Sequence, residues 1–214
     1  MDWTQAIDGY CERTDPGYWS EPVNAVTNLA FIIAAIIMWK RTAGLPAGRW
    51  LSGVLGAIGV GSYLFHTHAM VWSATLDVLP IAVFTLSFIY LANRDFWGLP
   101  VWGAALGTIA FFPYAAVLTP VFSSLPFFSI SSVYWVLPVL IAAYGLLLRK
   151  RASETGHGLL IGAGILTLSL VFRSLDEVLC AHIPAGTHFM WHILNGVVLG
   201  WMIEVWRRHK TSVA

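Results

Sequence analysis

The chain has 214 residues, of which 57% are hydrophobic and only 11% are charged. Soluble domains carry about 25% charged residues, so this composition excludes an ordinary soluble domain and indicates an integral membrane protein. The net charge of +1 provides no electrostatic attraction for nucleic acid, and we expect no nucleic-acid partner.

Seven apolar segments are long enough to cross a bilayer as helices. A transmembrane helix needs about 20 mostly apolar residues, and glycine, proline and charged residues mark the breaks between segments. We therefore predict an all-α fold, a single seven-transmembrane-helix domain over residues 1–214, with residues 1–21 outside the membrane. In chain order the predicted spans are residues 22–40, 50–67, 74–93, 98–118, 129–148, 157–175 and 187–206.

Lysine and arginine are divided unevenly between the two sides of this arrangement. Short loops rich in these residues remain in the cytoplasm. We therefore predict an extracytoplasmic N-terminus and a cytoplasmic C-terminus, in a bacterial inner membrane or, in a eukaryotic cell, an organelle membrane. The residues on the cytoplasmic side are Lys40, Arg41, Arg49, Arg94, Arg149, Lys150, Arg151, Arg207, Arg208 and Lys210.

Both cysteines fall on the predicted outer side. Cys11 precedes the first span, and Cys180 lies between the sixth and seventh spans. Disulfides persist in oxidising compartments, so we predict a disulfide that ties the N-terminal segment to the last outer loop. The alternative is two free thiols.

Histidines gather at the outer ends of two predicted spans. His188 and His192 are four residues apart and share a helix face, as two ligands of one metal ion would. His66, near the outer end of the second span, would complete a three-histidine set with an open position for water, which is typical of catalytic zinc sites. Each histidine alone is more simply an interfacial side chain. Ionisable groups within a membrane are costly, however, and their shared depth favours a function.

Two further polar residues at the same depth suit hydrolysis. Asp77, at the outer start of the third span, is a candidate to accept a proton from water. Ser62, one turn before His66, is a candidate to donate a hydrogen bond to an oxyanion.

Several stretches of the chain carry a family resemblance: YCER and EPVNAVTNLAF, GSYLFHTHAMVWSATLDVLPI, SLDEVLC and HFMWHILNG. With them the chain resembles the alkaline ceramidases, which are seven-span zinc-dependent amidases in a superfamily that includes adiponectin-receptor-like proteins. The resemblance implies zinc bound by His66, His188 and His192, water activated by Asp77, a supporting role for Ser62, and the same disulfide. It also implies a membrane lipid substrate, ceramide or a related N-acyl lipid, that is cleaved to a fatty acid and a long-chain amine.

The resemblance further implies a calcium site in the N-terminal segment. Gly9 and Thr14 stand where the family has Asp and Asn, so a neighbouring carboxylate would have to supply the missing oxygens. A solvated acidic stretch is the alternative. The calcium candidates are Asp8, Glu12 and Glu21, together with the carbonyl oxygen of Tyr10.

Two other functions are consistent with such a chain. A seven-transmembrane lipid receptor or sensor with a structural zinc site would lack multiple-turnover hydrolysis. A transporter would need polar groups through the whole membrane depth, whereas here they cluster at one end.

Overall fold

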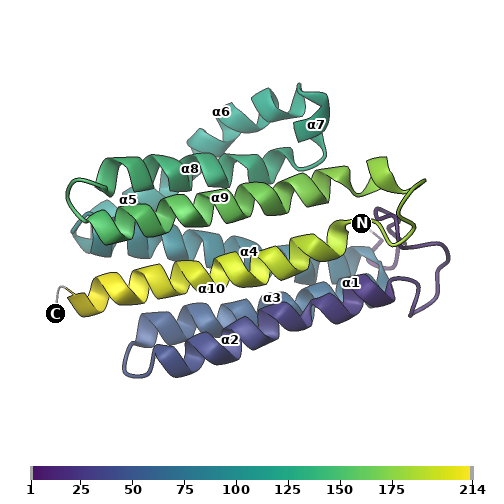
Figure 1. Cartoon of the computed structure of the whole chain (residues 1–214), viewed down its shortest axis with the longest axis horizontal. Helices are drawn as coiled ribbons and strands as arrows, with labels where there is room; N and C mark the ends of the chain where they lie inside the picture. Colours follow the sequence, from purple (N-terminus) through teal and green to yellow (C-terminus); the bar gives the residue numbers. More distant parts are fainter. Residues whose placement is uncertain (1, 213–214) are drawn as a thin grey trace.

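The computed structural model describes residues 2–212, and within this range the regular structure is helical apart from one isolated bridge between Ala6 and Met70. The long helices lie side by side in a bundle (Figure 1). The π-helical segment η1 (Ala92–Phe96) extends α4, and the 3-10 turn η2 (Glu177–Leu179) follows α9. The α-helices are α1 (Pro22–Thr27), α2 (Leu29–Arg41), α3 (Pro46–His68), α4 (Val71–Leu91), α5 (Val101–Ile109), α6 (Phe111–Ser123), α7 (Pro126–Ser129), α8 (Ser132–Leu148), α9 (Ser153–Leu175) and α10 (His188–Ser212).

Among the described residues, five helical segments are long and apolar enough to cross a membrane, which indicates a multi-pass membrane protein. The predicted second and fifth spans are also helical, as α3 and α8, but α8 is shorter and the glycines, serines and histidines of α3 make it less apolar. The count of seven spans therefore stays a prediction. The five segments are Pro22–Arg41, Val71–Phe96, Val101–Ser123, Ser153–Leu175 and His188–Ser212.

The helix ends differ from the predicted ranges at several places. α3 begins at Pro46 rather than at residue 50, because proline fits the first turn of a helix. The segment predicted at 98–118 consists of two helices, α5 and α6, and continues to Ser123. α10 runs to Ser212, beyond residue 206, so the helix includes the polar residues that follow the predicted span.

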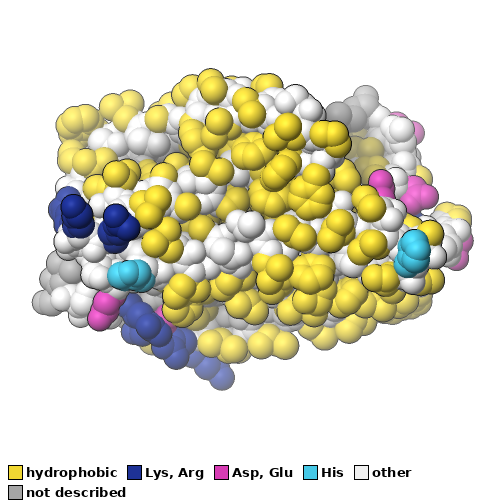
Figure 2. All heavy atoms as spheres, turned by 45° about the horizontal axis from the view of Figure 1, so that its top comes forward, with side chains coloured by type: hydrophobic (Ala, Val, Ile, Leu, Met, Phe, Trp, Pro, Cys, Tyr) yellow, Lys and Arg dark blue, Asp and Glu magenta, His cyan; other side chains and the backbone are white. Residues whose placement is uncertain are grey.

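The two ends of the bundle differ in charge. The loops between α2 and α3 and between α8 and α9 lie at the same end as the C-terminus, and the N-terminal segment lies at the other (Figure 1). Figure 2 shows lysine and arginine gathered at the C-terminal end of one face, with a largely hydrophobic surface between the ends. This distribution is what the predicted orientation requires, and the orientation itself stays a prediction.

Helix α10 is central in the bundle. It packs against α9, α2 and α3, and its N-terminal end also meets α1 (Figure 1). A side chain near the start of α10 is therefore surrounded by the N-terminal segment and by the last turns of α3.

Helices α3 and α4 approach each other closely at Gly61. A Cβ atom at this position would collide with the carbonyl oxygen of Leu76, so only glycine permits this crossing. Ser62 and Asp77 follow these two residues directly in the chain, and both line the same cavity.

The predicted disulfide is confirmed. Cys11 and Cys180 are bonded, with their Cα atoms 5.5 Å apart. The bond ties the N-terminal segment to the loop between α9 and α10.

Candidate metal centre and lipid cavity

The three predicted histidines come together at the N-terminal end of the bundle. His66 lies in the last turns of α3, and His188 and His192 lie in the first two turns of α10. One ring nitrogen from each lies within 4.8 Å of the other two, and each residue is only 1% exposed. Within residues 2–212 this is the one group of three or more histidine, cysteine or acidic side chains close enough to hold a metal ion.

Each of the three rings has a buried nitrogen without a hydrogen-bond partner: Nε2 of His66, Nδ1 of His188 and Nε2 of His192. Buried polar atoms are nearly always paired, since leaving one unpaired costs free energy. A metal ion bound by three neutral imidazoles would satisfy such nitrogens. The residues present therefore fit a metal of the kind that prefers imidazole, such as zinc.

Two of the histidines are oriented by neighbouring side chains. Nδ1 of His66 lies 2.6 Å from a carboxylate oxygen of Glu21, and Nδ1 of His192 lies 3.0 Å from the hydroxyl oxygen of Thr27. The Thr27 hydroxyl donates to the carbonyl of Val23 at 2.8 Å, so it accepts from the histidine. Both rings therefore carry a proton on Nδ1, which leaves the lone pair of Nε2 free to bind a metal.

Glu21 is ionised in this arrangement although it is only 2% exposed. Burial raises the pKa of its carboxyl group, but the hydrogen bond from His66 and the guanidinium of Arg13 outweigh burial and bring the pKa below its ordinary value. Glu21 is therefore a carboxylate acceptor for His66.

The candidate calcium ligands have other partners. The carboxylate of Glu12 accepts the backbone N–H groups of Val23 at 2.7 Å and Asn24 at 2.8 Å, at the start of α1. Asp8 is exposed, and within the described chain these residues form no cluster that could hold a metal. One oxygen of Glu21 contacts His66 and the other contacts Arg13, so this arrangement does not fit a calcium ion.

Tyr10 contributes its side chain to the site. Its ring stacks on that of His188, with the ring centroids 3.8 Å apart. Burial raises the pKa of Tyr10 to about 12, so the phenol stays neutral at physiological pH. Tyr10 therefore covers one side of a candidate metal-binding histidine without adding charge.

Asp176 fixes the start of α10. This carboxylate is 2% exposed and accepts the backbone N–H groups of Thr187 at 2.7 Å, His188 at 2.8 Å and Cys11 at 3.0 Å. An acidic side chain at a helix N-terminus satisfies unpaired N–H groups and complements the helix dipole. Asp176 thus positions the helix that carries two of the three histidines.

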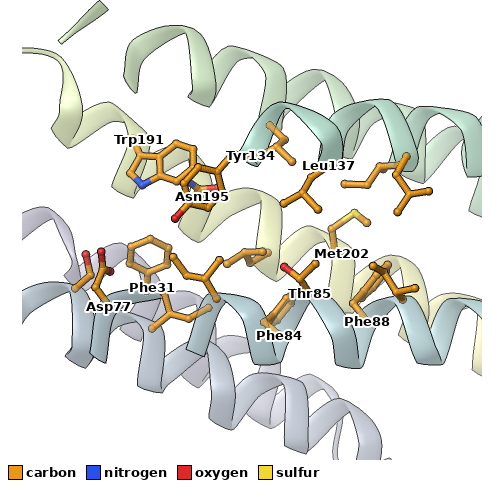
Figure 3. Close-up of a pocket in the computed structure, with 18 residues that line it drawn as sticks. Phe31, Asp77, Phe84, Thr85, Phe88, Tyr134, Leu137, Trp191, Asn195 and Met202 are labelled. Carbon is orange, nitrogen blue, oxygen red and sulfur yellow. The ribbon is translucent and has the colours of Figure 1, made fainter. Parts of the chain in front are cut away.

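A cavity of about 90 Å³ extends into the bundle from Ser62 and Asp77. In Figure 3, Asp77 lies at one end of this cavity, and Phe88 and Met202 lie toward the other. Apart from a few polar groups, its walls are aliphatic and aromatic side chains from α2, α3, α4, α8, α9 and α10. The cavity suits a hydrocarbon chain whose polar end lies at Asp77.

Asn195 adds a polar group to this wall. It is 6% exposed, it lines the cavity near Trp191 (Figure 3), and its side-chain N–H₂ group has no hydrogen-bond partner. The sequence signal for this residue was only its position three residues after His192. An unpaired donor in an apolar cavity is a candidate partner for a polar group of a bound lipid.

The comparison with known protein families agrees with this site. A family model described as Ceramidase matches residues 7–211, which is nearly the whole chain and includes all three histidines, Ser62 and Asp77. No individual curated protein matches the chain closely enough to count as a relative. The extent of the family match shows that this chain belongs to the ceramidase family.

Proposed function

We propose that this protein is a zinc-dependent membrane amidase that hydrolyses ceramide or a related N-acyl lipid to a fatty acid and a long-chain amine. Membership of the ceramidase family supports a hydrolase that acts on a lipid amide. The observation that carries the zinc assignment is the buried group of His66, His188 and His192, each with an unpartnered ring nitrogen.

The three histidines would hold the zinc ion. Glu21 orients the ring of His66, Thr27 orients that of His192, and Asp176 binds the backbone N–H of His188. Zinc bound in this way supplies a Lewis acid and lowers the pKa of water to about 7. The protein would supply the remaining functions: binding the lipid, placing its amide, and moving protons.

Asp77 is the proposed general base and acid. It would accept a proton from the attacking water as the new C–O bond forms at the amide carbon. It would then deliver that proton to the nitrogen as the C–N bond breaks, so that the amine leaves neutral. Ser62 lines the same end of the cavity and would donate a hydrogen bond to the developing oxyanion.

The cavity would hold the hydrocarbon chain. Asp77 and Phe88 are separated by roughly 16 Å along the axis of α4, because an α-helix rises about 1.5 Å per residue. Such an apolar passage removes much of an acyl chain from contact with other lipids while its amide lies at Asp77. Asn195, near the same end, would hydrogen-bond a carbonyl or hydroxyl oxygen of the lipid.

The proposed orientation places this chemistry at the extracytoplasmic surface. With seven spans and an outer N-terminus, the disulfide and the three histidines lie on the outer side, where a lipid of the outer leaflet reaches the site. The basic residues then lie in the cytoplasm, as their distribution favours.

The test is mass spectrometry of a lipid mixture incubated with the purified protein, with and without a zinc chelator. The mixture contains ceramides and other N-acyl lipids of several chain lengths. We expect chelator-sensitive loss of one amide lipid with equimolar fatty acid and amine, over many turnovers. A folded, zinc-loaded protein that turns over none of these lipids would contradict the proposal and favour a lipid receptor or sensor.

A further inference from the structure

Arg13 is a buried cation beside the candidate metal centre. Its side chain is only 5% exposed, and its Nε atom lies 2.5 Å from Glu21. Its other nitrogens donate to three carbonyl oxygens: those of His66 at 3.0 Å, Asp15 at 3.2 Å and Gly17 at 3.4 Å. The guanidinium is thus surrounded by oxygen atoms from the N-terminal segment and from the end of α3.

This set of acceptors is of the type that a calcium ion takes. Calcium prefers carboxylate and backbone carbonyl oxygens, and the set around Arg13 consists of one carboxylate oxygen and three carbonyls. A guanidinium is always charged, and its fixed donors match several oxygens at once. A calcium ion among the same oxygens would lie against this positive charge, and the two cations would repel each other.

Arg13 acts on both the ring and the backbone of His66. It contacts Glu21, whose other oxygen holds Nδ1 of the His66 ring, and it contacts the carbonyl oxygen of His66 itself. That carbonyl lies in the last turn of α3, where no further helical N–H group is available to pair with it. One side chain therefore restrains both the backbone and the ring of a metal-binding residue.

We propose that Arg13 is a built-in cation that replaces a calcium ion and positions His66 through Glu21, so that the metal centre of this chain assembles without calcium. The inference rests on the three-histidine centre of the proposed function and does not depend on which lipid is hydrolysed. Arg13 acts through Glu21 and is a positioning residue.

The first test uses the wild-type protein. The metal-free protein is reloaded with one equivalent of zinc and titrated with calcium chloride, with magnesium chloride as the matched control for ionic strength. We expect no bound calcium by elemental analysis and the same melting temperature and zinc affinity in both salts. A stoichiometric calcium ion, or a calcium-specific increase of tenfold or more in zinc affinity, would overturn the proposal.

The second test compares Arg13→Ala and Arg13→Lys with Arg49→Ala. Arg49 is exposed and stacks on Trp39 at the opposite end of the bundle, so it controls for loss of a positive charge. We expect Arg13→Ala to weaken zinc binding by about 10- to 100-fold and to change the visible spectrum of the cobalt-loaded protein. Arg13→Lys should fall between Arg13→Ala and wild type, because it keeps the charge but not the fixed geometry of the donors.

Unchanged zinc affinity and cobalt spectrum in a folded Arg13→Ala protein would mean that Arg13 has only a structural role and would overturn the proposal. If Arg13→Ala does not fold, the calcium titration of the wild type decides the question alone. A zinc-free wild type would contradict both proposals, whereas zinc binding without lipid turnover would contradict only the proposed function.

Discussion

The carboxylate of Asp176 accepts the backbone N–H of His188 at 2.8 Å and so connects the end of α9 to the first residue of α10. The same side chain accepts the backbone N–H of Cys11, which forms the disulfide with Cys180. The disulfide and the helix that carries His188 and His192 therefore share one buried anchor.

Replacing Asp176 with Ala should lower the stability of the protein markedly. Two buried N–H groups and one partly buried N–H group would lose their charged acceptor, which costs roughly 3 kcal/mol of unfolding free energy. The measurement is thermal unfolding in detergent, with Glu177→Ala as the control because that neighbouring side chain is exposed. Equal melting temperatures for the two variants would contradict this role.

Replacing His192 with Ala should remove the metal and the hydrolysis while leaving the helical fold intact. Two histidines cannot hold zinc with the affinity of three, so zinc content by elemental analysis should fall well below one equivalent. His182 is an exposed histidine in the nearby loop, and His182→Ala should keep both metal and activity. Full zinc content in His192→Ala would remove this residue from the proposed ligand set.

Replacing Asp77 with Asn should reduce turnover while zinc stays bound. A positioned general base contributes about 10²- to 10⁴-fold to the rate, and an amide cannot accept the proton from water. The measurement combines kcat for the lipid amide with zinc content of the same sample. A variant that keeps its kcat would show that Asp77 is not the base.

Replacing Thr27 with Val should weaken zinc binding by about tenfold, because Nδ1 of His192 loses the oxygen that orients the ring. Valine has nearly the same shape, so the fold should be preserved. Thr75→Val is the matched control, since the hydroxyl of this exposed threonine donates only to its own helix. Competition with a chromophoric chelator gives both affinities, and equal values would argue against the orientation of His192 by Thr27.

Replacing Leu137 with Trp should shift chain-length preference toward shorter acyl chains. Leu137 lines the middle of the cavity on α8 (Figure 3), and a larger side chain there shortens the apolar passage. Val139→Trp, on the same helix but 45% exposed, should leave the preference unchanged. The measurement is kcat/KM over a series of N-acyl lipids, and the same preference in both variants would argue against the cavity as the acyl-chain site.

Much of this protein could be predicted from its sequence because the signals are local. The predicted spans rest on runs of apolar residues, and the spacing of His188 and His192 places both on one face of any helix. The disulfide was predicted because both cysteines fall on the same predicted side of the membrane, and the structure confirms the bond. Local spacing could not assign His66 to this group. That assignment rested on its predicted depth in the membrane, near the outer end of its span, which matches the depth of His188 and His192.

The residues that support the histidines could not be predicted in this way. In the sequence, Thr27 is one polar residue within a predicted span and Asp176 directly follows the end of another. Their roles depend on which distant residue each one meets. The family resemblance implied that Glu21 is a calcium ligand, because the sequence does not distinguish a carboxylate that binds an ion from one that pairs with a side chain. Its pairing with His66, 45 residues away, exists only once α3 has packed beside the N-terminal segment.

The sequence by itself therefore determined the helical membrane character and the three candidate metal-binding histidines, since hydropathy and helical periodicity act over a few turns. Only the tertiary structure decided what holds those residues in place and which positive charge neutralises Glu21. Carboxylates, hydroxyls and guanidinium groups have many suitable partners, and only packing selects one. At Glu21 packing selected Arg13. These two residues are only eight positions apart in the sequence, but the role that they share depends on their contacts with His66.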